Sequence, residues 1–438
     1  MGGILKPDPP FLTARAGVHA SVSSSAVGHV SSKRTGPEGF RMTLSVLTLA
    51  RTLPSQITGG LEESSWNLAR SLSSLGVEET ILTTSFSGQS VVRKEDGVTI
   101  HELAYVPGRL RSKPTYRWWP YFARAAASYA RDLGLSADII HTQSLYANGF
   151  LEFPARPPIL ATVHGTPRGD YYGGARTKLI KEVGVVHPRV LYQYFAVVGA
   201  TYRAKKQLRD VDAIVPVSQN VAEALPGVPR GDPRVVIIPN GIDPKDFPWI
   251  ERGEARESLG LSNNATVLLF IGRMEESKGV GLLLNALRAI PEAILVVAGA
   301  GPYLEPFRTL AAKDPSVSRV RILGPVRKER FLLYSAADLF CLPSRNEGQP
   351  VSLLEAMAMG TPVATSRPWL PRELLPFSAI GTDIEPVIRA GLKLSQSVNR
   401  LDLRRLVLDR FNWNRLARDY LTIFQNLASN SARRQAMR

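Results

Sequence analysis

Short apolar runs rich in β-branched residues alternate with amphipathic stretches from Thr43 onward. The first run, Leu44–Leu49, predicts a strand, and the spacing of apolar residues predicts a helix over Leu61–Leu75. Further strands are predicted at Thr80–Thr84, Ile139–Thr142, Ile159–Val163, Ala213–Val217 and Val235–Ile238. A second series, with a helix between each pair, is predicted at Val267–Ile271, Ile294–Ala298, Val320–Leu323, Leu339–Leu342 and Pro362–Thr365. This alternation is typical of βαβ units built on a parallel sheet.

The two series meet near Pro239–Thr266, which predicts an α/β protein with two doubly wound domains. We place these domains at 42–238 and 239–408, followed by a helix over 409–428 that packs back toward the first domain and a disordered tail over 429–438. Residues 1–41 lack periodicity and are interpreted as a disordered extension or as a start upstream of the true one. Because ligands bind beyond the carboxyl ends of the strands in such folds, we expect the site between the two domains.

Charge and cysteine content narrow the possible classes of function. The 438 residues include 54 lysines and arginines against 38 acids, and this net charge of +16 suits nucleic acid, anionic membranes or phosphorylated substrates. The single cysteine, Cys341, excludes an internal disulfide, fits a reducing compartment such as the cytoplasm, and is expected to be a buried structural thiol. Apolar runs stay well short of the roughly 18 residues that a membrane-spanning helix needs.

Two loops carry groups suited to binding phosphates. Gly59 and Gly60 precede the first helix, where paired glycines let the backbone approach a ligand and the helix N-terminus offers free N–H groups. Their alternative role is a simple turn. Arg273 and Lys278 follow the strand Val267–Ile271, and their guanidinium and ammonium groups suit a pyrophosphate. The alternative for these two is a pair of solvated surface cations.

The sharpest pattern is a pair of acids, Glu347 and Glu355. Glu347 lies in the loop after a buried strand and Glu355 just inside the next helix, so both can face one cleft. Because Ser352 stands three residues before Glu355, these two residues also fit a capping box, in which the carboxylate stabilises the helix. For Glu347 the alternative is a solvated loop acid.

The segment Glu347–Glu355 resembles the E-x7-E motif of the retaining family-4 glycosyltransferases, which have the GT-B fold of two Rossmann-like domains. Other segments resemble motifs of that family in the same order: Val163–Pro167, Val235–Asp243, the Arg273 and Lys278 loop, Gly299–Pro302, Leu354–Ala358 and Gly360–Thr365. The resemblance extends from about Met42 to Leu427. It implies that 42–238 binds the acceptor and that 239–408 binds a nucleotide-sugar donor.

The resemblance assigns a role to each candidate residue. Glu347 would bind hydroxyls of the donor sugar and Glu355 the nucleotide ribose. Arg273 and Lys278 would hold the diphosphate, and His164 would reach the transferred sugar from the other domain. The remaining substrate-binding candidates are the glycine amides of Gly59 and Gly60, Val326 beside the base, and Gly348 and Gln349 next to Glu347.

The resemblance also implies a hydroxyl acceptor, attack on the same face of the sugar with retention of configuration, and no metal or other cofactor. Fixed cations and amides would stabilise the leaving diphosphate where its charge develops. Asp210 and Asp212 have the spacing of a metal site in other sugar transferases. Similar acidic corners before two other predicted strands favour a structural role instead. Ser366–Glu373 departs from the family pattern of two glycines and a glutamate, which leaves sugar identity and activity open.

The acceptor side contains Arg109–Phe122, which combines basic and aromatic residues without an acid. This composition suits an anionic membrane surface, with Tyr202–Arg209 extending the patch, and it fits a lipid-linked acceptor or a growing polysaccharide at the inner face of the plasma membrane. The alternative is a solvated helix face with core aromatics. Nucleic-acid binding leaves the glycine loops and paired acids unexplained, so no nucleic-acid partner is expected. A nucleotide-sugar isomerase and an inactive binding subunit on the same fold stay open as alternatives.

Overall fold

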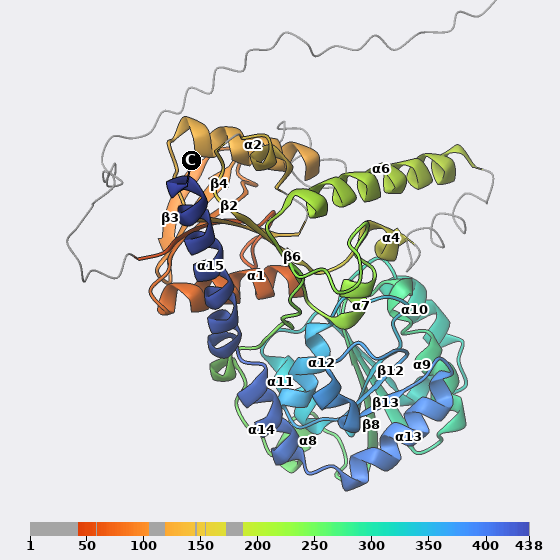
Figure 1. Ribbon diagram of the computed structural model, residues 1–438. Coiled ribbons are helices and arrows are strands. Elements are labelled where there is room, and N and C mark those ends of the chain that lie inside the picture. The colour runs from red at the N-terminus through yellow and green to blue at the C-terminus, as the bar shows by residue number, and fades with distance from the viewer. Residues whose placement is uncertain are drawn as a thin grey trace, which may run out of the picture. The chain divides into compact units, whose positions relative to one another are not determined.

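The structure is a computed structural model that describes residues 43–437 apart from 58, 105–118, 145–146, 154 and 172–186. The described chain forms two sheets, each with helices on both faces (Figure 1). This confirms the predicted α/β class with doubly wound sheets. Across these described ranges, no helix combines the length and the apolar character needed to span a bilayer.

The first sheet has seven strands in the order β3-β4-β2-β1-β5-β6-β7. Every neighbouring pair is parallel except β3 and β4. The strands are β1 Ser45–Leu49, β2 Glu78–Thr84, β3 Val91–Glu95, β4 Val98–Leu103, β5 Ile139–Gln143, β6 Ile159–Val163 and β7 Ala213–Pro216. Its helices are α1 Gly60–Ser74, α2 Trp119–Asp132, α3 Asn148–Leu151, α4 Pro167–Asp170, α6 Pro188–Asp210 and α7 Gln219–Glu223.

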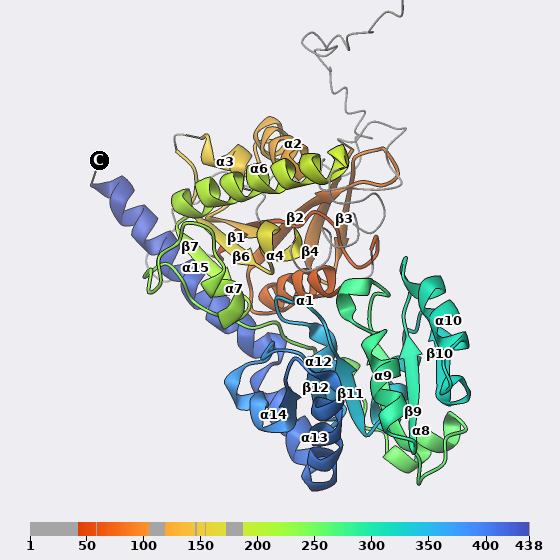
Figure 2. The ribbon, with the colours of Figure 1, turned by 90° about the vertical axis from the view of Figure 1, so that its right-hand side faces the viewer.

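Two separate apolar layers cover the faces of this sheet. Phe122 of α2, Phe150 of α3 and Leu208 of α6 pack on one face. Leu68 and Leu72 of α1 pack on the other. Figure 2 shows this arrangement, with α2, α3 and α6 on one side of the strands and α1 on the other.

The second sheet has six parallel strands in the order β10-β9-β8-β11-β12-β13. The strands are β8 Thr266–Ile271, β9 Ala293–Ala298, β10 Val320–Gly324, β11 Leu339–Leu342, β12 Val363–Thr365 and β13 Ser378–Ile380. Its α-helices are α8 Arg252–Ser258, α9 Leu282–Ala289, α10 Leu304–Ala312, α11 Glu329–Ala336, α12 Val351–Ala358, α13 Ile384–Ser397 and α14 Arg400–Arg410. Short 3-10 turns are η4 Pro244–Asp246, η5 Glu276–Lys278, η6 Val317–Arg319 and η7 Arg372–Phe377. Cys341 is buried in β11, as expected for a structural thiol.

The strand predicted at Val235–Ile238 is wrong as a full strand. This segment follows β7, with Val236 N and Ile238 N donating to Ile214 O and Pro216 O, but it forms only one isolated bridge. A continuous ladder fails because Pro216 has no amide proton to donate. The structure adds the hairpin of β3 and β4, whose turn at Asp96 and Gly97 has positive φ at both positions, 48° and 82°. Aspartate followed by glycine is a hairpin signal that the sequence carries.

The three acidic corners have the structural role that their recurrence indicated. In each, an aspartate just before a strand accepts a hydrogen bond from a backbone amide at the start of the neighbouring strand. Asp138 bonds Ser45 N at 2.9 Å, Asp212 bonds Ile159 N at 2.9 Å, and Asp338 bonds Val267 N at 2.7 Å. Asp212 also pairs with Arg156 at 2.7 Å. These bonds set the register between adjacent strands.

The last helix, α15, begins at Trp413 and joins the core of the first sheet. Trp413, Leu416, Tyr420 and Phe424 are buried there beside α1. The helix continues to Ala436, past residue 428, so the prediction of a disordered tail from residue 429 is corrected. Extending an existing helix adds one hydrogen bond for each ordered residue, and the packed turns before residue 428 supply the nucleus. The residue boundaries of the predicted domains stay predictions.

Candidate active site

Lys278 and Glu347 meet at the carboxyl ends of β8 and β11. Lys278 Nζ lies 2.6 Å from Glu347 Oε1, and the two side chains are only 17% and 10% exposed. The two loops that carry them are joined by a backbone bond from Arg345 N to Ser277 O of 2.9 Å. Gly279 has φ of 71°, and a Cβ there would lie 2.2 Å from Pro343 O, so glycine allows the loops to pack this closely. The structure therefore brings together two residues predicted from separate motifs.

Arg273, the second predicted cation, is ion-paired with a different acid. Its side chain is 68% exposed, and its ionic partner among the described residues is Glu275 at 3.2 Å. A guanidinium this exposed is free to turn toward a ligand, but it contributes little to the protein's own packing.

The loop of Glu347 also contacts the end of β6. A Cβ on Gly348 would lie 1.9 Å from His164 O, so the two backbones touch and only glycine fits. Ser218 Oγ, just before α7, donates to Gly348 O at 2.7 Å. Glu347 immediately precedes Gly348 in the chain, so the contact of Gly348 with His164 also restricts the position of Glu347.

The imidazole of His164 is bonded to the interior of the first sheet. His164 Nε2 lies 2.9 Å from Gln143 Oε1, at the end of β5. Burial lowers the pKa of His164 to about 4, so the ring is neutral at pH 7.

The starts of α1 and α12 lie side by side. Gly60 is the first residue of α1, and a Cβ there would lie 3.3 Å from Val351 Cγ2 at the start of α12. Neither helix has a side-chain cap, so the N-terminal amides and positive dipole ends of two helices lie near this contact. Gly59 is the N-cap of α1, where a Cβ would meet Glu62 Oε2 at 2.4 Å.

Glu355 is held by two side chains of α11. Tyr334 OH donates to Glu355 Oε2 at 2.9 Å, and Arg330 Nε lies 3.3 Å from Glu355 Oε1. The capping-box alternative with Ser352 is wrong, because α12 begins at Val351 after Pro350 and has no side-chain cap. Burial raises the pKa of Tyr334 well above its usual range, so its hydroxyl stays a donor.

Gln349 and Val326 complete the predicted set. Gln349 is 5% exposed and binds Asn240, whose backbone N donates to Gln349 Oε1 at 2.5 Å and whose Nδ2 donates to Gln349 O at 3.1 Å. The side chain of Gln349 thus joins the Glu347 loop to the Val235–Asp243 segment. Val326 follows β10, is partly buried and packs against the core of the second sheet.

Two family models match this chain. The model for Glycosyltransferase Family 4 matches residues 58–246, and the model for Glycosyl transferases group 1 matches residues 251–376. Together they leave only 247–250 unmatched between 58 and 376, and they include the Glu347 to Glu355 segment.

This chain is a family-4 glycosyltransferase.

Curated relatives agree with this membership. An uncharacterized glycosyltransferase of Methanocaldococcus jannaschii is 24% identical over 399 residues, which cover 85% of this chain and 95% of that protein. D-inositol 3-phosphate glycosyltransferase of Actinosynnema mirum is 27% identical over 70% of this chain and 76% of its own. Alpha-monoglucosyldiacylglycerol synthase of Streptococcus pneumoniae is 30% identical over 53% of each chain.

Solved structures confirm the fold. Sucrose-phosphate synthase from Thermosynechococcus elongatus superposes with a TM-score of 0.72 at 20% identity, covering 88% of this chain and all of that one. The predicted GT-B fold, with two doubly wound Rossmann-like domains, is therefore confirmed for this glycosyltransferase.

The segment Ser366–Glu373, which departs from the family pattern, is anchored in this glycosyltransferase by apolar burial. Trp369 and Leu370 are buried in the core of the second sheet. Ser366 Oγ donates to Ser344 O, and Asn220 Nδ2 donates to Pro368 O at 3.1 Å. Glu373 is exposed in η7. A buried indole thus fixes the loop where glycines were expected.

Sequence reasoning missed several residues that contact the candidate site residues of this glycosyltransferase. They are the partners Gln143, Ser218, Asn240, Arg330 and Tyr334. Asn240 lies inside a motif that the sequence identified. The spacing of Arg330 and Tyr334 places both on one face of α11, which is a usable signal. Gln143 and Ser218 carry no such pattern. Within the described part of the chain, no three His, Cys, Asp or Glu side chains gather as a metal site.

Proposed function

We propose that this glycosyltransferase moves a sugar from a nucleotide-diphosphate donor to a hydroxyl acceptor, with retention and without a metal. The buried contact between Lys278 and Glu347, 2.6 Å long, carries the proposal. This contact places an ammonium and a carboxylate at the strand ends. Glu347 is followed in the chain by Gly348, whose backbone contacts His164 O. A sugar diphosphate needs both charges, because the carboxylate accepts bonds from sugar hydroxyls and the ammonium binds phosphate oxygens.

In the proposed reaction the bond between the sugar C1 and the diphosphate oxygen breaks. The acceptor oxygen bonds to C1 on the same face, and the acceptor proton passes to the leaving phosphate oxygen. Lys278 and the amides at the starts of α1 and α12 stabilise the new phosphate charge. Arg273 turns from solvent onto the diphosphate. The neutral His164 ring bonds a hydroxyl of the transferred sugar.

Glu355 is proposed to bind the ribose of the donor. Its carboxylate is fixed by Tyr334 and Arg330, so its remaining lone pairs are oriented before the donor arrives. Orienting an acceptor in advance lowers the cost of ordering the nucleotide.

A donor screen tests this proposal. UDP-, GDP- and ADP-sugars are incubated with inositol phosphate or diacylglycerol as acceptors, the two classes that the relatives' names supply. Nucleotide release is measured with and without chelator. We expect one donor to release nucleotide in the presence of an acceptor, at a rate that chelator leaves within about twofold, since fixed cations replace the metal. Loss of activity with chelator would contradict the metal-free mechanism.

We also propose a peripheral contact with anionic membranes, centred on α6. Most of the predicted patch, Arg109–Phe122, lies outside the described residues, and Phe122 itself is buried against the first sheet. Between residues 191 and 202, α6 instead exposes a stripe of apolar and aromatic side chains: Leu191, Phe195, Val198 and Tyr202. No acid occurs from Pro188 to Arg209, and Arg203, Lys205 and Lys206 are exposed. Apolar rings beside cations suit the headgroup region of a bilayer.

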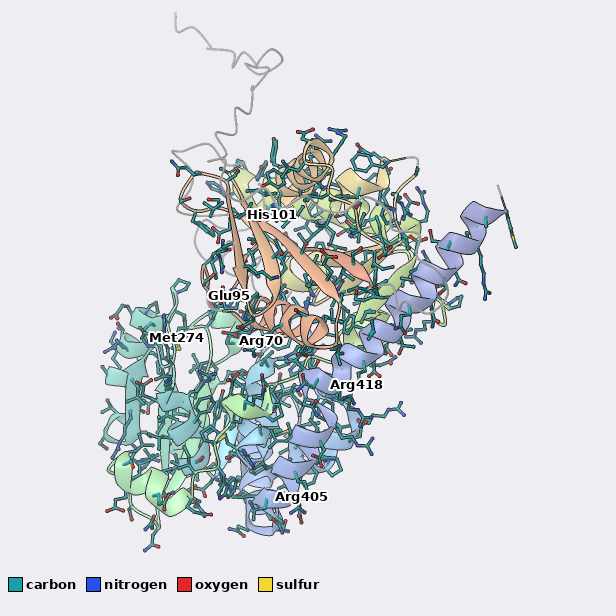
Figure 3. All side chains as sticks on the ribbon, turned by 90° about the vertical axis from the view of Figure 1, so that its left-hand side faces the viewer. Arg70, Glu95, His101, Met274, Arg405 and Arg418 are labelled. Carbon is teal, nitrogen blue, oxygen red and sulfur yellow. The ribbon has the colours of Figure 1, made fainter. Side chains whose placement is uncertain are left out.

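Vesicle sedimentation tests the membrane contact. Wild-type protein is expected to sediment with vesicles of phosphatidylglycerol and phosphatidylcholine, but not with phosphatidylcholine alone. The double variant Leu191→Glu, Phe195→Glu should bind at least tenfold more weakly, because each apolar side chain contributes about 1.5–3 kcal/mol on burial. Arg405→Glu, on the exposed side of α14 (Figure 3), changes the net charge equally and should leave binding within about twofold. Equal losses in both variants would contradict a docking role for α6.

A further inference from the structure

A row of buried polar side chains crosses the first sheet and ends at His164. Its members are Glu79 on β2, Thr48 on β1, His141 and Gln143 on β5, and Thr162 on β6, each only 1% exposed. Thr48 is the register partner of His141, and Gln143 that of Thr162, so the row follows adjacent strands.

The hydrogen bonds of this row are continuous. Thr48 donates to Glu79 Oε1, and Thr48 Oγ1 lies 3.5 Å from His141 Nδ1. His141 Nε2 lies 2.9 Å from Thr162 Oγ1 and 3.5 Å from Gln143 Nε2. Gln143 Oε1 then bonds His164 Nε2 at 2.9 Å. From α15, Tyr420 OH reaches Thr162 Oγ1 at 3.2 Å.

The carboxamide of Gln143 determines which atom is the donor and which is the acceptor in each hydrogen bond of the row. Gln143 Oε1 can only accept, so the proton of the neutral His164 ring sits on Nε2. Gln143 Nε2 can only donate, so His141 Nε2 accepts and the His141 proton sits on Nδ1, which donates to Thr48. The Thr48 proton then goes to Glu79. Burial lowers the pKa of His141 to about 3 and raises that of Glu79 to about 8, so both side chains are neutral at pH 7.

Burying the polar side chains of this row costs free energy, because the groups are removed from water. Apolar residues at the same positions would fill the space without removing polar groups from water. Leu47 on β1 and Leu160 on β6 show that the same strands accept apolar residues elsewhere in the interior. The presence of a polar row that ends on one imidazole therefore indicates that the row orients this imidazole.

We propose that Gln143 is a positioning residue, which holds His164 with its proton on Nε2 and leaves Nδ1 as the ring's free acceptor. His141, Thr48 and Glu79 hold the carboxamide of Gln143 in the matching orientation. The inference rests on the proposed contact between His164 and the transferred sugar. A fixed Nδ1 acceptor would receive a sugar hydroxyl without a tautomer change during the reaction.

Nitrogen NMR of the full-length protein with 15N-labelled histidine tests the tautomer directly. The chain has six histidines, and the signals of His164 are identified by their absence in His164→Gln. We expect His164 in the wild type to carry its proton on Nε2. In Gln143→Met, which keeps the side-chain volume but removes the acceptor, the signals should move toward a mixture of tautomers. His101, which bonds Tyr129 at 3.1 Å away from this row, is the internal control. A proton on Nδ1 in the wild type would overturn the proposal without any variant.

Enzyme kinetics provide the second readout. Gln143→Met should lower kcat about tenfold at every pH, while KM for the donor changes less. Gln143→Glu keeps an acceptor at Nε2 and adds a carboxylate beside the ring, which raises the pKa of His164. Its activity should be low near neutral pH and recover as the pH rises. Identical pH profiles for wild type and Gln143→Glu would overturn the positioning role. If the tautomer is as expected but His164→Gln retains full activity, the proposed sugar contact fails instead.

Discussion

Replacing Glu347 with glutamine should lower kcat for sugar transfer by about 10²–10³-fold, the range found when one fixed electrostatic contact to a transition state is lost. The variant keeps the size of the side chain but removes the charge that pairs with Lys278 at 2.6 Å. Bonds from sugar hydroxyls to a neutral amide are weaker than those to a carboxylate. Because positive charge develops on the sugar ring as the C1 bond breaks, the loss should fall mainly on kcat. Steady-state kinetics with the donor found in the screen measures it.

Glu373→Gln is the matched control for this experiment. Glu373 is an exposed acid of the same domain, in the segment that departs from the family pattern. Its replacement should change kcat by less than about twofold, because a solvated acid without a site contact contributes little. Thermal unfolding of both variants separates a loss of activity from a loss of folding. Unchanged transfer in a folded Glu347→Gln protein would show that the central assignment is wrong.

Replacing Asp338 with alanine should lower the free energy of unfolding by about 3–5 kcal/mol, as expected when one partner of a buried ion pair is removed. Asp338 Oδ2 accepts hydrogen bonds from Arg256 Nη2 at 2.8 Å and from Val267 N at 2.7 Å. The side chain of Arg256 is 1% exposed, so its guanidinium would be left buried without its counter-ion. Burial already lowers the pKa of Arg256, which reports the cost of this desolvation. Denaturant unfolding followed by circular dichroism measures the change.

Asp210→Ala is the control for Asp338→Ala. Asp210 pairs with Arg209, whose side chain is 71% exposed, at 2.8 Å. Ion pairs at the surface contribute about 0–1 kcal/mol, so this variant should unfold almost as the wild type does. Similar losses in the two variants would contradict the role given to the buried network.

The positions of the candidate binding motifs on strand ends, loops and helix starts were predictable because they depend on local sequence. A strand end, a loop cation and a helix start each leave a pattern within about ten residues, so Lys278, Glu347 and Gly60 could be found separately. Their meeting was an inference from the family resemblance, which the contacts of Lys278 with Glu347 and of Gly60 with Val351 now support. The structural role of the aspartates that precede three strands was predictable too, because each lies in a short, recurring sequence pattern.

Partners distant along the chain were not predictable. Glu355 looked like a helix cap because Ser352 lies nearby, whereas its partner Tyr334 comes from the preceding helix. Gln349 looked like a substrate ligand, yet its side-chain oxygen binds Asn240, 109 residues away in the sequence. Whether a polar side chain faces a ligand or another segment depends on which strands are neighbours, and periodicity does not state that order.

Hydrophobic periodicity and turn chemistry were enough to predict two doubly wound sheets and the loops that are candidates for binding phosphate and sugar. The resemblance of several motifs indicated the family. The contact of Glu347 with Lys278 rather than with Arg273, and the packing of α15 into the first core, became visible only in the fold. The same holds for the buried polar row that ends on His164. These features depend on side chains brought together from segments far apart in the sequence. Burial strengthens the electrostatic part of each of their hydrogen bonds.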